Sequence, residues 1–151
     1  MLTIIYILLG TILTDSNPSY EQLTADYFFG TIWKEKYKDY KSIEFENKTD
    51  STIYVGHVYG CSNWNEGDKK EINSGRTTKQ IVLTSNPTDI SIKGRTNSKR
   101  LKLIIGTKIQ LGDKYVVQMT VYKPFEFVDH YFIKFDKDGK IIDMCEFNEI
   151  I

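Results

Sequence analysis

Two side chains in otherwise apolar strand patterns have the chemistry of a general acid or base. In FEFVDHYFIKF, residues 125–135, strand alternation places Asp129 on the same face as Phe127 and Tyr131. A carboxyl group among apolar neighbours is costly to bury unless it is hydrogen-bonded, and catalytic acids and bases often occupy such places. Asp129 is therefore a candidate catalytic residue. The favoured alternative is a structural carboxylate that lies at the strand end or accepts hydrogen bonds from tyrosine hydroxyls.

His57 is the second candidate. In TIYVGHVYGC, residues 52–61, strand alternation groups His57 with Val55 and Tyr59. A histidine in this position acts either as a proton acceptor or as a satisfied interior or pocket-rim residue, and the second interpretation is favoured. His130 follows Asp129 directly, so a regular strand directs the two side chains to opposite faces. They therefore do not form a ready-made His–Asp dyad.

The sequence predicts no metal site and no cofactor. An EF-hand calcium loop needs Gly at its sixth position and Glu at its twelfth, but in DKDG, counted from Asp136, Gly139 is fourth and Phe147 is twelfth. DKDG instead predicts a hairpin turn in which Gly139 adopts a left-handed conformation. With two His and no CxxC, the sequence has no zinc-site pattern. It also lacks G-x-S-x-G, phosphate-loop and HExxH motifs.

The sequence contains two cysteines, Cys61 and Cys145. If the protein is exported, they are a candidate disulfide, and the long loop between them would contribute about 4 to 5 kcal/mol in the chain-entropy model. The alternative is a pair of buried thiols that act as small apolar side chains.

The elements that position these residues are one helix followed by many strands. In SNPSYEQLTADYFFGTIWKEKYKDYKS, residues 16–42, Ser19 and Gln22 are a candidate capping box, and Asn17 followed by Pro18 is the alternative helix start. Gly30 marks a kink or break in this helix. Helical spacing places Phe29, Ile32, Trp33, Tyr37 and Tyr40 on one face. The period then changes to two. The expected strands are 42–47, 52–59, 77–84, 101–109, 115–122, 125–135 and 140–147.

Short loops between these strands leave no room for helical crossovers, so an antiparallel sheet is expected. We predict an α+β domain at residues 18–151, in which the main N-terminal helix packs on a curved antiparallel sheet of about six or seven strands. The twelve residues after Met1 form an uncharged apolar run with the length of a signal-peptide core, so residues 1–17 are expected to be a leader, or alternatively a buried first element. The apolar run is too short for a bilayer-spanning helix.

Charge and aromatic content narrow the classes of partner. The 20 basic and 20 acidic side chains cancel, so the chain lacks the broad positive field that nonspecific nucleic-acid binding requires. The ten Tyr and eight Phe favour strands and also line apolar pockets, without deciding between core and pocket. The aromatic residues predicted to contact a ligand are Trp33, Tyr59, Phe127 and Tyr131.

The order of elements and the C-terminal HYFIKFDKDGKIIDMCEF resemble the cystatin-like and nuclear transport factor 2-like folds. The residues that carry the resemblance are His130, Phe132, Phe135, Asp138, Gly139, Lys140 and Ile141. It implies a helix clasped by a curved sheet, often around an apolar pocket. The Q-x-V-x-G motif of the protease-inhibiting cystatins is not matched, because Gln80 and Val82 are followed by Thr84.

A second resemblance is to lipocalin-like barrels, whose first strand carries G-x-W. Here GTIW, from Gly30 to Trp33, is one residue longer and lies in the helical pattern. The barrel is therefore the alternative fold.

These observations favour a non-enzymatic binding module that takes a small apolar ligand or a protein partner, with homodimerisation left open. The alternative is a small pocket enzyme, similar to the cyclases and isomerases of the nuclear transport factor 2-like group, with Asp129 or His57 as acid or base. If the leader is a signal peptide, the protein is exported to the periplasm or secreted. Otherwise it is cytoplasmic.

Overall fold

The computed structural model describes residues 18–38, 40–45, 52–74, 77–79, 89–91, 97–123 and 126–150. The expected leader at 1–17 lies outside them, and so does the part of the expected strand 77–84 that follows Lys79. Within the described ranges, no helix combines the length and the apolar composition needed to cross a bilayer.

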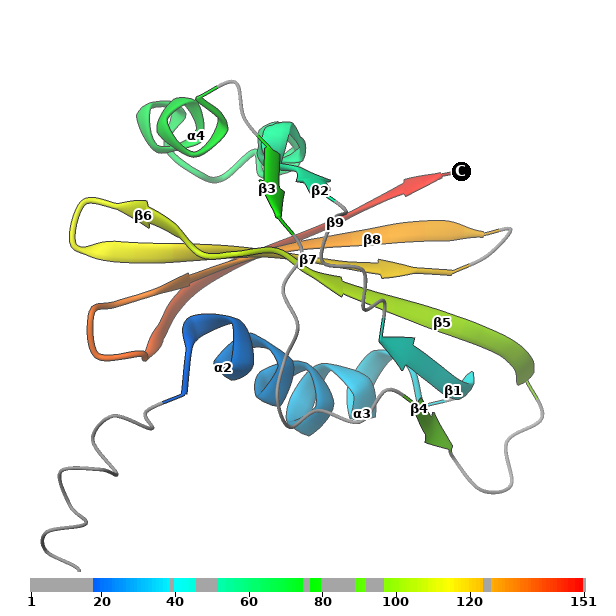
Figure 1. Cartoon of the computed structure of the whole chain (residues 1–151). Helices are drawn as coiled ribbons and strands as arrows, with labels where there is room; N and C mark the ends of the chain where they lie inside the picture. The colour runs from blue at the N-terminus through cyan, green and yellow to red at the C-terminus, as the bar shows by residue number, and fades with distance from the viewer. Residues whose placement is uncertain are drawn as a thin grey trace, which may run out of the picture.

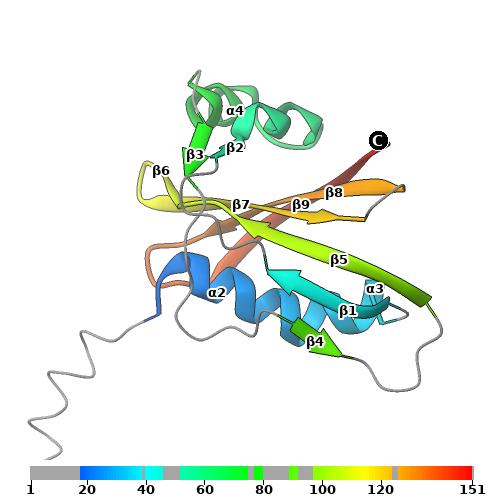
Figure 2. The ribbon, with the colours of Figure 1, turned by 45° about the vertical axis from the view of Figure 1, so that its right-hand side comes forward.

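A sheet separates two outer layers (Figure 1). One layer contains three consecutive helical elements: α2 (Tyr20–Tyr27), the π-helical turn η1 (Phe28–Ile32) and α3 (Trp33–Lys36). The opposite layer contains the 3₁₀ helix η2 (Val55–Gly60) and helix α4 (Glu66–Asn73). Figure 2 shows the same order of layers in a second view. Each face of the sheet therefore contributes to its own apolar core.

The first helical layer follows from an N-cap and one apolar face. Ser19 Oγ accepts a hydrogen bond from the Gln22 backbone N–H at 3.1 Å, as the predicted cap requires. The chain stays helical to Lys36, and the π-helical turn contains Gly30, where a kink or break was expected. The buried face consists of Ala25, Phe28, Ile32, Trp33 and Tyr37.

Five strands, β5 to β9, form the antiparallel part of an open sheet, fewer antiparallel strands than the six or seven expected. They are β5 (Asn97–Ile105), β6 (Ile109–Leu111), β7 (Lys114–Tyr122), β8 (Phe127–Phe135) and β9 (Ile141–Ile150). The sheet as a whole has seven strands, because two further strands at residues 40–45 and 89–91 extend it beyond β5. Strand β6 pairs with β7 beside the main path, and β9 is the outer strand at one end. Because this sheet is open, the alternative prediction of a lipocalin-like barrel is wrong.

Strand β1 (Tyr40–Phe45) corrects the expectation of purely antiparallel pairing, because it lies parallel to β5. A parallel pair needs a long crossover, and the chain between these two strands is long enough to include η2 and α4. Strand β4 (Asp89–Ser91) pairs antiparallel with β1. Strands β2 (Thr52–Tyr54) and β3 (Thr77–Lys79) form a separate antiparallel pair.

The segment around His57 also differs from expectation. The strand predicted at 52–59 ends at Tyr54, and the chain continues as the 3₁₀ helix η2. Helix α4 follows, and its N-terminus is capped by Asn65, whose Oδ1 accepts hydrogen bonds from the Gly67 and Asp68 backbone N–H groups. The strand alternation assumed for His57 is therefore wrong.

The DKDG segment forms the predicted hairpin turn between β8 and β9. The Asp136 N–H donates to Lys140 O at 2.9 Å, and Asp136 Oδ1 accepts from the backbone N–H groups of Asp138 and Lys140, each at 2.9 Å. Gly139 has φ +86°, the left-handed conformation that glycine adopts without steric cost. This turn brings Phe135 opposite Ile141 and so sets where β9 begins to pair.

Candidate functional site

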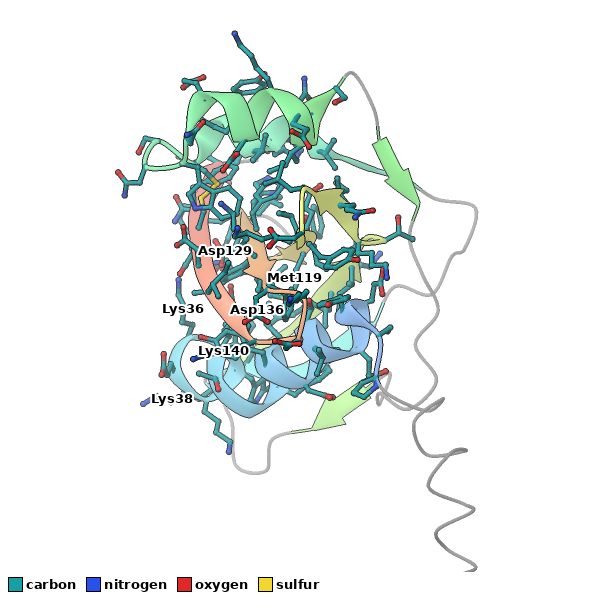
Figure 3. All side chains as sticks on the ribbon, turned by 90° about the vertical axis from the view of Figure 1, so that its left-hand side faces the viewer. Lys36, Lys38, Met119, Asp129, Asp136 and Lys140 are labelled. Atoms are coloured by element: carbon teal, nitrogen blue, oxygen red, sulfur yellow. A yellow bond between two sulfur atoms is a disulfide. The ribbon has the colours of Figure 1, made fainter. Side chains whose placement is uncertain are left out.

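Strand β8 carries two polar groups into opposite cores. Asp129 is 2% exposed and lies on the face that packs against the first helical layer, with Tyr131 and Ile133. His130, also 2% exposed, lies on the face toward η2 and α4, with Phe132. The alternation predicted for β8 is therefore confirmed. Figure 3 labels Asp129 in the sheet, between the two outer layers.

Asp129 is surrounded by groups that satisfy its charge. The Tyr37 hydroxyl donates to Asp129 Oδ2 at 2.5 Å, and Lys123 Nζ lies 3.2 Å from the same oxygen. The Tyr131 hydroxyl lies 2.8 Å from the Tyr37 hydroxyl. A buried carboxylate with a cation and a hydroxyl donor is a stable structural arrangement, as the favoured interpretation of Asp129 expects.

The tyrosines of this group resist ionisation. Burial raises the pKa of Tyr37 far above its ordinary value, and the neighbouring Tyr131 and Asp129 raise it further. Burial also raises the pKa of Tyr131, against a smaller opposing effect of its hydrogen bond with Tyr37. Both hydroxyls therefore remain neutral and act as hydrogen-bonding groups.

His57 and His130 come together with Glu149 of β9 on the opposite face. The two imidazole rings stack with centroids 4.1 Å apart. His130 Nε2 lies 3.3 Å from Glu149 Oε1, and His57 Nε2 lies 4.0 Å from it. One ligand-type atom from each residue falls within 4.8 Å of the other two. Two imidazoles and a carboxylate at this spacing are groups that could hold a metal ion.

Buried side chains of β7 lie against the other ring nitrogens. Thr120 Oγ1 is 3.4 Å from His130 Nδ1, and Gln118 Nε2 is 3.5 Å from His57 Nδ1. Burial lowers the pKa of His130, and the neighbouring His57 lowers it further, against smaller opposing effects of Glu149. Neutral imidazole, the form that binds metals, is therefore favoured at His130.

The four predicted ligand contacts do not gather around one cavity. Tyr131 and Trp33 are buried in the core between the first helical layer and the sheet. Tyr59, on η2, is 46% exposed, and Phe127, at the start of β8, is 37% exposed. Ligand binding by these four residues stays a prediction.

Cys61 and Cys145 form a disulfide that connects the segment after η2 to β9. Of the two alternatives left open by the sequence, the structure contains the bridge. Beside it is a pocket of about 190 Å³, lined on one side by residues 60–64 and on the other by residues 143–146, including the acidic Asp143 and Glu146. Figure 3 draws the bridge in yellow on the side of the sheet that faces α4.

Sequence reasoning missed Glu149 as a partner of the histidines, although the hairpin register contains the signal. With the turn at DKDG, His130 pairs with Phe147, so Glu149 lies two residues further along the same face of β9. The approach of His57 has no comparable local signal, because it depends on how η2 packs over β8.

Comparison of the chain with protein-family models, curated proteins and solved structures finds no match. The resemblance to cystatin-like and nuclear transport factor 2-like folds therefore stays a prediction.

Proposed function

We propose that the chain is an exported, non-enzymatic binding module that takes an extended, basic segment of a protein partner along β9. The observation that carries this proposal is the pairing of β9. It has ten residues, it ends the strand order, and among the described strands only β8 pairs with it. The outer side of such a strand offers a row of backbone donors and acceptors to a second strand.

Strand β9 lacks two of the devices that commonly protect sheet edges. Long edge strands are usually interrupted by Pro or guarded by Lys, and β9 contains neither. Ile142 and Ile150 are exposed near its two ends, with Ile150 78% exposed. This supports strand addition as the mode of binding.

The charges of β9 select the partner. The strand carries Asp143, Glu146 and Glu149 and no basic residue. Lys36, which Figure 3 shows beside β9, forms an ion pair with Glu146. The negative charge that Lys36 leaves uncompensated is therefore that of Asp143 and Glu149. A second copy of this chain would bring acidic strands together, which is unfavourable. A segment with Lys or Arg is complementary.

The pocket beside the disulfide strengthens the choice of a basic partner. Asp143 and Glu146 line the side of the pocket formed by β9, next to the backbone that the partner strand would pair with. A Lys or Arg side chain of a paired strand could reach the carboxylate of Asp143, which Lys36 does not pair with, while its stem packs on the pocket wall.

Export and the lack of catalysis are separate parts of the proposal. Export is supported by the apolar leader and by the Cys61–Cys145 disulfide, because such bonds persist mainly in oxidising compartments. A non-enzymatic role is supported by Asp129, whose charge is satisfied by Lys123 and Tyr37 within a packed core.

The test uses backbone chemistry at Asn148. The Met144 N–H donates to the exposed side chain of Asp143 at 2.8 Å, so we take it to point away from β8. Because N–H groups alternate along a strand, the N–H of Asn148, four residues on, points the same way. Asn148→Pro therefore removes a donor from the outer side, and Asn148→Ala, which keeps the N–H, is the matched control.

The probes are two synthetic decapeptides that differ only in charge, one alternating Lys with Val and one alternating Glu with Val. We expect the basic peptide to bind and to shift the NMR signals of β9 amides, while the acidic peptide does not. Asn148→Pro should weaken binding about tenfold, equivalent to one lost hydrogen bond, and Asn148→Ala by less than twofold. Equal binding of both peptides, or equal affinity of both variants, contradicts the proposal. Concentration-dependent dimerisation through β9 would replace the basic partner with a second copy.

A further inference from the structure

We propose that His57, His130 and Glu149 form a binding site for a divalent first-row transition-metal ion, such as Zn²⁺. The site lies on a face of the sheet, between η2, β8 and β9. The site shares Glu149 with the acidic side chains that would attract a basic partner, but it uses none of the backbone groups on the outer edge of β9. It is tested with the metal ion alone, so metal binding can fail while partner binding holds, and the reverse.

The distances suit a shared ion. A metal bound at about 2.0 to 2.2 Å from imidazole nitrogen and carboxylate oxygen needs its ligand atoms about 3 to 3.5 Å apart. His130 Nε2 and Glu149 Oε1 are 3.3 Å apart, and His57 Nε2 is 4.0 Å from the same oxygen. The ligand-type atoms of the three residues all lie within 4.8 Å of one another, so the half-buried His57 ring must move toward the other two ligands to complete the set. Three protein ligands leave one position of a tetrahedral site for water or an outside ligand.

The neighbours of the two histidines suit metal binding. A metal-bound imidazole uses one nitrogen for the metal and donates from the other to a polar partner. Thr120 Oγ1, 3.4 Å from His130 Nδ1, can accept that proton. For His57 the corresponding neighbour is Gln118, which lies 3.5 Å from Nδ1. Both Nε2 atoms then remain directed toward Glu149.

Gln118 provides an independent observation. Its side chain is completely buried, and within the described part of the chain its Oε1 atom has no hydrogen-bond partner. Orphaned buried carbonyls are rare in native structures. Rotating the amide by half a turn exchanges two groups of nearly equal shape, so that Oε1 gains His57 Nδ1 as a partner and Nε2 takes the position that Oε1 now occupies. Gln118 can thus hold the tautomer of His57 that presents Nε2 to a metal.

The disulfide holds the two parts of the site together. Cys61 lies four residues after His57, and Cys145 lies four residues before Glu149. The bridge therefore fixes η2 against β9 near the ligands. Phe147 stacks on His130 from the other side, with ring centroids 5.0 Å apart. Ligands held in place before binding lose less conformational freedom when the ion binds.

Solvent can reach the site through its outer ligands. His130 is buried, but the side chains of His57 and Glu149 are 29% and 55% exposed. An ion can therefore enter from the solvent side and meet the buried imidazole last. This arrangement also allows the two outer ligands to be changed by substitution without removing a fully buried side chain.

The test is a calorimetric titration of the oxidised, metal-free protein with Zn²⁺ alone. We expect one ion per chain. Removing an outer-shell partner typically weakens metal binding 10- to 100-fold, so Glu149→Gln and His57→Asn, which remove ligands, should each weaken it by about 100-fold or more. Asp143→Asn is the matched control, because it removes a carboxylate of β9 outside the cluster, and it should leave the affinity within twofold.

Two further measurements distinguish a preorganised metal site from nonspecific binding of ions to surface carboxylates. Co²⁺ should give visible absorption bands of a low-coordinate ion with nitrogen ligands in the parent protein but not in His57→Asn. The double variant Cys61→Ser with Cys145→Ser should bind Zn²⁺ about tenfold more weakly, because η2 is no longer tied to β9. The absence of saturable Zn²⁺ binding overturns the proposal. Equal weakening by Asp143→Asn and Glu149→Gln also overturns it, because surface attraction would then explain the binding.

Discussion

At the scale of single residues, Asp129 shows that a buried carboxylate in an apolar strand, a feature typical of catalytic acids and bases, can also be accounted for by its structural partners. It is a buried carboxylate beside a tyrosine hydroxyl, as an acid–base residue would be. Lys123 and Tyr37 account for its charge, and His57 lies on the other side of the sheet. The sequence was sufficient to place Asp129 on an apolar face, because period-two alternation needs only β8 itself. The sequence alone could not predict that Lys123 pairs with Asp129, because Lys123 lies just beyond the end of β7, outside the period-two pattern.

The tyrosines around Asp129 predict an alkaline loss of stability. The pKa of Tyr37 is raised in the folded protein, mainly by burial, and that of Tyr131 is raised as well. Above about pH 10, the unfolded chain loses these protons while the folded chain keeps them, so the free energy of unfolding falls as pH rises. Below about pH 10 both tyrosines are protonated in the folded and the unfolded chain, so their contribution to the free energy of unfolding is fully present.

The Tyr37→Phe substitution should make the free energy of unfolding fall less steeply as the pH rises above about 10. Each such tyrosine contributes a slope of up to about 1.4 kcal/mol per pH unit above pH 10, and the variant removes one contribution. The lost hydrogen bond to Asp129 shifts the whole curve but does not depend on pH in this range. Urea unfolding of the two proteins at several pH values from 8 to 11 measures the difference. Parallel curves above pH 10 would show that Tyr37 ionises equally in both states.

At the scale of elements, local signals predicted the helix and the hairpin but failed between β1 and β5. Ser19 and Gly139 act through their own backbone surroundings, so their roles were visible in the sequence. From Val55 to Asn73 the apolar residues follow neither a clear period of two nor a clear helical period. In α4, Ile72 is the apolar side chain that is buried in the core. The structure of this segment depends on packing against β8 and β9, which no local pattern contains.

Gly60 lies at a close contact between η2 and β9, and Gly30 offers a matched control for its substitution. A Cβ atom at Gly60 would lie 2.6 Å from the Phe147 ring, whereas one at Gly30 would meet nothing within 4 Å. Gly60→Ala should therefore displace the ring and lower the free energy of unfolding by about 1 to 3 kcal/mol. Gly30→Ala should raise it by about 0.5 to 1 kcal/mol, because alanine favours a helix over glycine.

Chemical denaturation of both variants measures these changes. NMR signals of His130, which stacks on Phe147, report whether the ring has moved. A Gly60→Ala protein with unchanged stability and unchanged His130 signals would mean that η2 does not pack closely on β9.

At the scale of the whole molecule, the two outer layers differ in how they are attached. The first helical layer packs on the sheet through a broad apolar core and continues directly into β1. Among the described residues, the core under η2 and α4 is the smaller of the two, and this layer is joined to β9 by the disulfide. The sequence identified the cysteine pair but could not choose between bridge and thiols, because that choice depends on the same docking of η2.

The bridge should therefore carry a large share of the stability of the molecule. It joins residues separated by 84 positions, and closing a loop of this length is worth about 4 to 5 kcal/mol in the chain-entropy model. Cys61→Ser combined with Cys145→Ser should lower the free energy of unfolding by about that amount, and dithiothreitol should do the same to the parent protein. Dithiothreitol should not affect the double variant, which serves as the control. If reductant leaves the urea midpoint of the parent unchanged, the second layer is held by its apolar core alone.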